Sequence, residues 1–186
     1  MKPSRRSVLL GLGGSLVAPA VRAAVIDASG LPAQPWFLQS FLDLREDLET
    51  AAANGKRLAI LIEQKGCPFC KQLHEVNFAD PVVSEWIRQR FEILQLDLHG
   101  SRELTDLDGS KHEEKAFARR IAGQMTPVAI FLPADPAEAA GRPAHLAAVA
   151  RMPGYLPPRE FLALFRYVYE QAYRHEGFEA YRRREA

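Results

Sequence analysis

A continuous apolar run ends just before the two cysteines of this chain and limits the folds that it can adopt. The run is RLAILIE, residues 57–63, and turn residues stand on both sides of it. A segment with this pattern favours a buried central strand, because both faces of such a strand are covered. Cys67 and Cys70 follow, separated by Pro68 and Phe69. The pattern predicts a buried strand, a short turn and a helix that begins at the cysteines.

Strand and helix patterns alternate along the remainder of the chain. After an irregular lead-in, apolar spacing predicts helices over residues 41–54, 67–78, 82–90, 111–122 and 157–184. Apolar runs predict further strands over residues 91–98, 126–132 and 145–151. This order indicates an α/β fold, with a mostly parallel sheet and helices on both of its faces.

The first residues of the chain have the features of an export signal. Arg5 and Arg6 precede an apolar run of 14 residues, and Val21-Arg22-Ala23 offers a site for signal peptidase. This run is shorter than the roughly 20 residues that a membrane-spanning helix needs. The segment SRRSVLL resembles a twin-arginine export signal, and a Sec signal or a retained N-terminal anchor is the alternative. We predict a signal peptide at residues 1–23 and one domain at residues 24–186.

The charge of the chain argues against a nucleic-acid partner. The whole chain has a net charge of +1, and removal of residues 1–23 takes away four basic residues and no acidic residue, which leaves −3. A mildly acidic domain lacks the basic surface that binds nucleic acids or anionic membranes. The 163 residues that remain are enough for one domain with a sizeable core.

The residue types around the cysteines favour a reactive pair. With Cys67 as the N-cap, Pro68 takes the first helical position, for which its fixed φ is suited. Cys70 then lies on the same helix face, within the Cα separation that a disulfide requires. The helix N-terminus favours the thiolate of Cys67, and Lys65 can add to this effect. We predict that Cys67 is the nucleophile and that Cys70 resolves the mixed disulfide.

Two other uses of the cysteines are open. One is a structural disulfide, although a bridge across so short a loop stabilises a fold poorly. The other is a zinc or copper site of a metal-binding chaperone, because Cys67, Cys70 and His74 fall at spacings of three and four on one helix face. A closed structural zinc site needs four ligands, and the other four histidines are scattered singly. Cycling between dithiol and disulfide is the favoured interpretation.

Three landmarks give the chain a resemblance to thioredoxin-fold proteins. They are the strand RLAILIE followed by CPFC, the segment Met125-Thr126-Pro127, and Gly154 ahead of the last helix. The resemblance implies a three-layer fold in which helices flank a central mixed β-sheet. It also implies that Pro127 is a cis proline that faces the disulfide and that Thr126 pairs with substrate backbone. A trans proline that opens an edge strand is the alternative.

A narrower resemblance is to the SoxW-type periplasmic thioredoxins of bacterial sulfur-oxidation systems. It rests on GCPFCKQLHEVNFADP at residues 66–81, LTDLDG at residues 104–109 and ARMPGYLPPREFL at residues 150–162. It implies a periplasmic reductase of client-protein disulfides, without a bound cofactor, that receives electrons from a membrane thiol transporter of the CcdA/DsbD type. A disulfide-forming oxidase is the alternative. An isomerase, which would need a dimerisation module, is disfavoured. We expect a monomer.

The segment around the cysteines departs from thioredoxins at several positions. Gly66 stands where thioredoxins have Trp, and Pro68 and Phe69 between the cysteines are nearer the glutaredoxin pattern. An exposed Phe69 beside the nucleophile would suit a protein client. Leu61 occupies the position of a buried thioredoxin Asp, and Glu63 lies two residues later on the same strand face. Glu63 is either the general base that accepts the proton of the second cysteine or an exposed residue at the strand end.

The segment at residues 100–110 is polar and rich in turn residues. Alignment with an EF-hand loop puts Leu104 at the first ligand position and Lys115 where a bidentate Glu must stand. The calcium interpretation therefore fails at two ligands. We predict a solvated acidic loop that could dock a partner.

Overall fold

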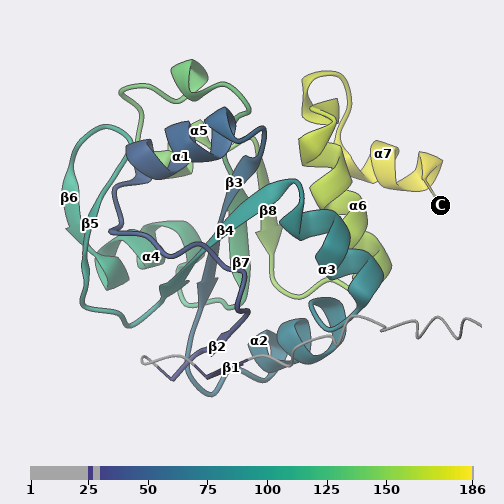
Figure 1. The fold of residues 1–186 in the computed structure, drawn as a ribbon, viewed down its shortest axis with the longest axis horizontal. Helices are drawn as coiled ribbons and strands as arrows, with labels where there is room; N and C mark the ends of the chain where they lie inside the picture. Colours follow the sequence, from purple (N-terminus) through teal and green to yellow (C-terminus); the bar gives the residue numbers. More distant parts are fainter. Residues whose placement is uncertain (1–24, 27–29, 186) are drawn as a thin grey trace, which may run out of the picture.

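A computed structural model describes residues 25–26 and 30–185, and the predicted signal peptide lies outside them. A four-stranded sheet stands at the centre, with helices on both faces (Figure 1). The predicted α/β class with a central mixed sheet is thereby confirmed. Among the described residues, no helix is long and apolar enough to cross a membrane.

The directions of the strands differ from those expected from the order of elements. The spatial order is β4 (Phe91–Asp97), β3 (Arg57–Glu63), β7 (Val128–Phe131) and β8 (Ala150–Pro153). β3 is parallel to β4 but antiparallel to β7, which is antiparallel to β8. The expected mostly parallel sheet is therefore wrong. No long crossover helix links β7 to β8, and strands joined without one pair in antiparallel fashion.

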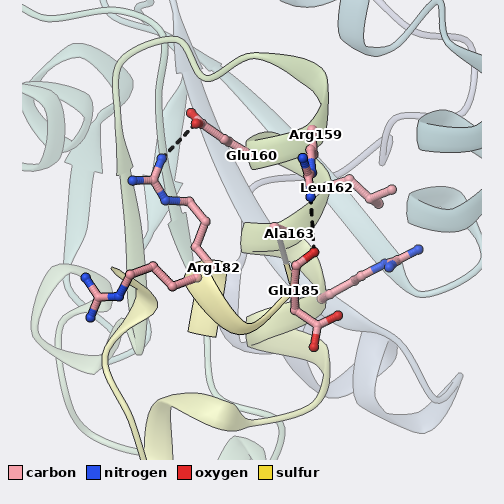
Figure 2. A pocket seen from close by; sticks show the side chains of 8 residues that line it. Arg159, Glu160, Leu162, Ala163, Arg182 and Glu185 are labelled. Carbon is pink, nitrogen blue, oxygen red and sulfur yellow. Dashed lines mark hydrogen bonds and ion pairs between the residues drawn. The ribbon is translucent and has the colours of Figure 1, made fainter. Parts of the chain in front are cut away.

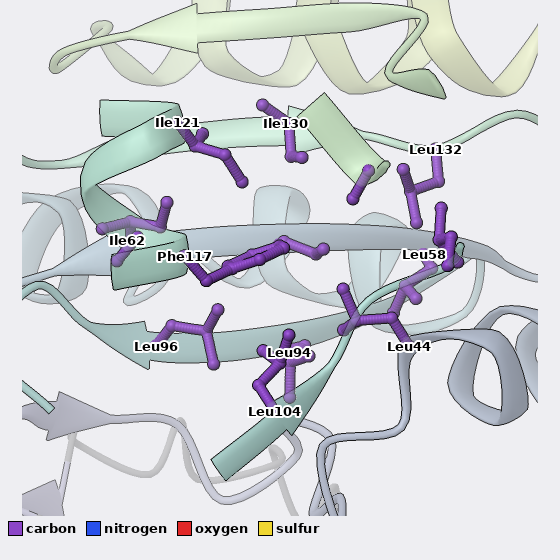
Figure 3. Close-up of a cluster of buried hydrophobic side chains, with 14 of the residues drawn as sticks. Leu44, Leu58, Ile62, Leu94, Leu96, Leu104, Phe117, Ile121, Ile130 and Leu132 are labelled. Atoms are coloured by element: carbon purple, nitrogen blue, oxygen red, sulfur yellow. The ribbon is translucent and has the colours of Figure 1, made fainter. Parts of the chain in front are cut away.

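Two pairs of helices cover the sheet. α1 (Leu44–Ala53) and α4 (Glu114–Ala122) pack on one face, and α3 (Pro81–Arg88) and α6 (Pro158–Tyr169) pack on the other. Each face has its own cluster of buried apolar side chains. The cluster under α1 and α4, which we call the first core, includes Phe117 between the sheet and α4 (Figure 3).

The central strand β3 contributes to both cores because successive side chains of a strand point to opposite faces. Leu58, Ile60 and Ile62 belong to the first core, whereas Ala59 and Leu61 belong to the core under α3 and α6. Burial on both faces explains why the run at residues 57–63 is continuously apolar.

The cysteine segment forms a helix in two parts. α2 (Pro68–Gln72) continues into η1 (Leu73–Asn77), a π-helical turn in which the Phe78 N–H donates to the Leu73 carbonyl at 3.0 Å. The helix predicted over residues 67–78 is thus confirmed, with a local change of winding in its second half. Before it, β1 (Val25–Ile26) pairs with β2 (Pro32–Ala33) in the lead-in.

The polar segment after β4 forms a hairpin rather than a loop. β5 (Glu103–Thr105) pairs with β6 (Lys111–Glu113) in antiparallel fashion. Leu104 and Leu107 are buried in the first core, so the hairpin is held against the domain by apolar contacts.

The acidic residues of this hairpin are only partly solvated. Asp106 is completely buried, and its Oδ1 accepts hydrogen bonds from the backbone N–H groups of Leu107 at 2.7 Å and Ala144 at 2.8 Å. The prediction of a solvated loop is therefore wrong at Asp106. Asp108 is exposed, and hydrogen bonds from Ser110 hold the pKa of its carboxyl below the usual value.

The bounds of two other predicted elements also differ. The first helix begins after its N-cap Asp43, and Phe41 lies outside it, fully exposed. The strand expected over residues 145–151 is divided into the helical turn α5 (Ala144–Ala147) and β8. A 3₁₀ turn, η2 (Pro136–Glu138), precedes them.

The long final helix expected over residues 157–184 is broken into three. α6 is followed by the 3₁₀ turn η3 (Ala172–Arg174) and by α7 (Phe178–Arg184). The break begins at Gln171, whose φ of 56° is left-handed and incompatible with a continuing right-handed helix.

Two phenylalanines provide a matched test of this packing. Phe117→Ala empties a fully buried site and should lower the free energy of unfolding by about 3–5 kcal/mol. Phe41→Ala makes the same chemical change at a fully exposed site and should change it by less than about 0.5 kcal/mol. Urea denaturation measures both, and equal effects would contradict the assignment of Phe117 to the core.

Candidate functional site

Cys67 is the N-cap of α2, as predicted. Its backbone is extended, with φ −75° and ψ 115°, and its Sγ accepts a hydrogen bond from the Cys70 N–H at 3.1 Å. Pro68 takes the first helical position. The two cysteines form a disulfide, with their Cα atoms 5.2 Å apart. The expectation that this spacing permits a bridge is confirmed.

The two sulfurs differ in their access to solvent. Cys67 is 8% exposed, and Cys70 is 0% exposed because it lies on the inner face of the helix. Lys65 is exposed, and its side chain lies beside Gly30 of the lead-in. A partner's sulfur can therefore approach Cys67 but not Cys70.

The segment before β7 lies against the nucleophile. Antiparallel pairing of Ile62 with Val128 places the start of β7 at the end of β3 from which the cysteine segment leaves. The peptide bond between Thr126 and Pro127 is cis, as the resemblance implied, and the Thr126 carbonyl oxygen lies 3.6 Å from Cys67 Sγ. An extended backbone that docks along this segment would thus pass next to the reactive sulfur.

An aromatic pair flanks the cysteines. Phe69 is 54% exposed, in agreement with the sequence analysis, and its ring stacks on Tyr155 at 6.3 Å between centroids and 23° between planes. Tyr155 was not singled out from the sequence, although it directly follows Gly154, which the resemblance did use. The pair gives the surface beside Cys67 an apolar character.

Glu63 is buried behind the cysteine helix. Its side chain is 0% exposed, so the alternative of an exposed residue at the strand end is wrong. Glu63 Oε2 lies 2.9 Å from His74 Nε2 and 2.5 Å from Gln95 Nε2. The sequence analysis missed Gln95 and Gln34 because they come from β4 and the lead-in, far from the cysteine motif.

His74 is engaged on both ring nitrogens. Nε2 contacts Glu63, and Nδ1 lies 3.2 Å from Gln34 Nε2, while the ring itself is almost completely buried. A histidine with both nitrogens occupied has no free electron pair to offer a metal beside Cys67 and Cys70. Within the part of the chain that the structure describes, no three His, Cys, Asp or Glu side chains are grouped as metal ligands would be.

A pocket between α6 and α7, of about 350 Å³, is a separate feature (Figure 2). Two of its four arginines have hydrogen-bond partners across the pocket: Arg182 donates to Glu160 at 2.7 Å and Arg159 to the Glu185 carbonyl at 3.4 Å. None of the predicted site residues lines it. Disulfide exchange needs an accessible sulfur rather than a cavity, so this pocket is not needed for the chemistry at Cys67.

Comparison with known proteins agrees with this geometry. A model of the thioredoxin-like domain matches residues 44–169, which include both cysteines and the cis proline. The chain belongs to the thioredoxin-like domain family. The pair of Cys67 and Cys70 at disulfide distance in a thioredoxin-like domain indicates a thiol–disulfide oxidoreductase.

Two solved structures are similar to this chain. A thioredoxin-fold protein from Helicobacter pylori is 18% identical, with a TM-score of 0.54 over 70% of this chain and 84% of that chain. A thioredoxin from Thermus thermophilus is 25% identical, with a TM-score of 0.48 over 68% of this chain and 83% of that chain. No curated protein sequence matches the chain. The Helicobacter pylori protein supports the thioredoxin-like fold and nothing finer.

The difference in exposure predicts a difference in alkylation. In the reduced protein, iodoacetamide should modify Cys67 at least about tenfold faster than Cys70, because Cys67 is accessible and its thiolate is favoured at the helix N-terminus. Mass spectrometry of Cys67→Ser and Cys70→Ser measures each thiol alone. Equal rates in the two variants would contradict the assignment of Cys67 as the more accessible nucleophile.

Proposed function

We propose that this protein is a periplasmic thiol–disulfide oxidoreductase that reduces disulfides of client proteins through Cys67 and Cys70. The observation that carries the proposal is the pairing of an accessible N-cap sulfur with a buried one in a thioredoxin-like domain. The accessible sulfur can attack a client, and the buried sulfur can react only with its neighbour.

The reaction has two exchange steps. The Cys67 thiolate attacks a client disulfide, which forms a mixed disulfide and releases one client thiolate. The Cys70 thiolate then attacks Cys67 Sγ, and the second client thiolate leaves. The client gains two electrons, each of its thiolates takes up a proton, and the protein becomes the Cys67–Cys70 disulfide.

The surface around Cys67 suits an extended protein segment. Client backbone would pair with Thr126 beside Pro127, because the Thr126 carbonyl is already next to the reacting sulfur. Phe69, carried on the first turn with Pro68, would contact an apolar side chain of the client. These contacts bind client backbone and apolar side chains. Because many proteins offer such groups, the surface permits more than one client.

The proposed electron donor and compartment rest on features of the sequence. The resemblance to SoxW-type thioredoxins favours a membrane thiol transporter of the CcdA/DsbD type as the electron donor, and a role in sulfur oxidation. Export through the signal at residues 1–23 would place the domain in the periplasm. The dithiol of the donor supplies both electrons, so the cycle needs no bound cofactor, and we expect the protein to act as a monomer.

Trapping of clients tests the order of the steps. Cys70→Ser should accumulate mixed disulfides with clients in the periplasmic fraction of a bacterial host, because Cys67 attacks but cannot be released. Cys67→Ser should trap none, since its remaining sulfur is buried. Non-reducing gels with and without thiol measure both. Equal trapping would overturn the nucleophile assignment, and adducts confined to the cytoplasm would overturn the export proposal.

The midpoint potential tests the direction of electron flow. We expect the Cys67–Cys70 pair to lie near the roughly −270 mV of thioredoxin, since a reductase must hold its electrons more weakly than its clients do. Equilibration against thiol buffers, read by alkylation, measures it. A value near the roughly −120 mV of a strong oxidant would mean that the protein forms disulfides instead.

A further inference from the structure

We propose that His74 is a positioning residue that holds the Glu63 carboxyl group in place to take the proton of the Cys70 thiol. This inference rests on the proposed function and assigns the proton transfer within it. It gives His74 a role in the redox step in place of a metal ligand, and it adds Gln34 as the residue that fixes the His74 ring.

The hydrogen bonds determine which groups donate. The amide nitrogen of Gln95 lies between two oxygens, 2.7 Å from the Pro32 carbonyl and 2.5 Å from Glu63 Oε2, so it donates to both. The amide nitrogen of Gln34 donates to His74 Nδ1. His74 therefore carries its proton on Nε2, and Nε2 donates to Glu63 Oε2 at 2.9 Å.

Two donors thus converge on one carboxylate oxygen. Hydrogen bonds from neutral donors favour the ionised form of a carboxyl group over the protonated form. Glu63 Oε1, in contrast, is buried and has no hydrogen-bond partner. Buried oxygens of this kind are rare because the loss of water is not compensated. The two donors orient the carboxyl group through Oε2, and Oε1 is left as an open acceptor.

The position of His74 relative to Cys70 places the Glu63 carboxyl group on the same side of the helix as the second cysteine. His74 follows Cys70 by four residues, and both side chains are buried, so they share the inner face of one helix. Glu63 ends the strand that leads into that helix. Phe37 and Phe78 flank the His74 ring at 5.7 and 5.3 Å between centroids. These rings give the buried pair of His74 and Glu63 apolar surroundings, in which Glu63 is the group proposed to take the proton.

The path of the Cys70 proton in the second exchange step can be written in full. Cys70–SH gives its proton to Glu63 Oε1, and the resulting thiolate attacks Cys67 Sγ. The bond from Cys67 to the client sulfur breaks, and the client thiolate leaves with the electron pair. Glu63 then returns the proton to solvent or to the departing thiolate. The dithiol of the electron donor later restores both protons and both electrons to the cysteines.

The other charged groups near Glu63 are few among the described contacts. Asp97 is its partner in the register with β4, and its Oδ1 accepts a hydrogen bond from the His99 N–H. Lys71 and Glu75 on the same helix are exposed and form an ion pair of their own at 3.7 Å. Gln34 and Gln95 carry no charge. If replacement of His74 changes the pH dependence of the closure rate, the change therefore reports on Glu63. Asp97 is the neighbouring acidic residue that could also contribute.

The closure step can be measured without a client. Oxidised glutathione places a mixed disulfide on Cys67, and stopped-flow detection of released glutathione gives the rate of attack by Cys70 at each pH. His74→Leu should slow closure at pH 7 by at least about tenfold and move its rise to higher pH, since Glu63 loses a donor. His74→Gln, which can still donate to Glu63, should restore closure to within about threefold of the original protein.

Four further variants separate positioning from structure. Glu63→Gln should be as slow as His74→Leu, and the double variant should be no slower than Glu63→Gln alone. Gln34→Leu, which leaves His74 in place, should show a smaller loss with the same shift in pH, and it keeps the test decisive if His74→Leu does not fold. His175→Leu, at an exposed histidine, should close at the original rate.

Two outcomes would contradict the inference in different ways. One outcome is that His74→Leu and Gln34→Leu leave the closure rate unchanged, or lower it by the same factor at every pH. His74 then does not position Glu63, and the inference is wrong while the proposed function stands. If glutathione forms no mixed disulfide on Cys67 in the original protein, the proposed function falls and takes the inference with it.

Discussion

The pairing of β3 with both of its neighbours is the constraint on which the site depends. β4 and β7 hydrogen-bond to its two edges, and helices bury both of its faces. A strand held on four sides has a fixed end, and three parts of the site meet at that end. The cysteine helix leaves from it, the cis peptide at Thr126 and Pro127 lies beside it, and Glu63 is its last residue.

Features that depend on neighbouring residues were predictable from the sequence. β3 has the predicted bounds because a continuous apolar run needs burial on both faces, which few other segments of the chain could satisfy. Cys67 is the N-cap because Pro68 favours the first helical position whatever surrounds it. The strand directions and the break at Gln171 were not predictable, since both are set by packing between distant segments.

The same distinction between local and distant contacts applies to the residues of the site. Cys67, Cys70 and Pro127 belong to short motifs and could be located from the sequence, whereas the surroundings of Glu63 come from three separate segments: the lead-in, the cysteine helix and β4. Helical spacing placed His74 on one face with the cysteines, which is correct, but spacing alone cannot tell a ligand from a buried partner of a carboxylate. The contact with Gln34 decides between these uses, and that contact depends on where the lead-in crosses the helix.

The energetic cost of Glu63 is itself informative. A buried carboxylate loses its hydration, and a structural role would be better served by full compensation or by an apolar side chain. Compensation here is confined to one oxygen, although β3 accepts apolar residues at all its other buried positions. Leu61 occupies the position at which thioredoxins keep their acid, and moving the acid two residues along the strand keeps it on the same face but brings it to the end where the helix begins. The second exchange step is served by a base on the buried side of the cysteine helix, and the proposed role of Glu63, with one open oxygen, would meet that need at the expense of stability.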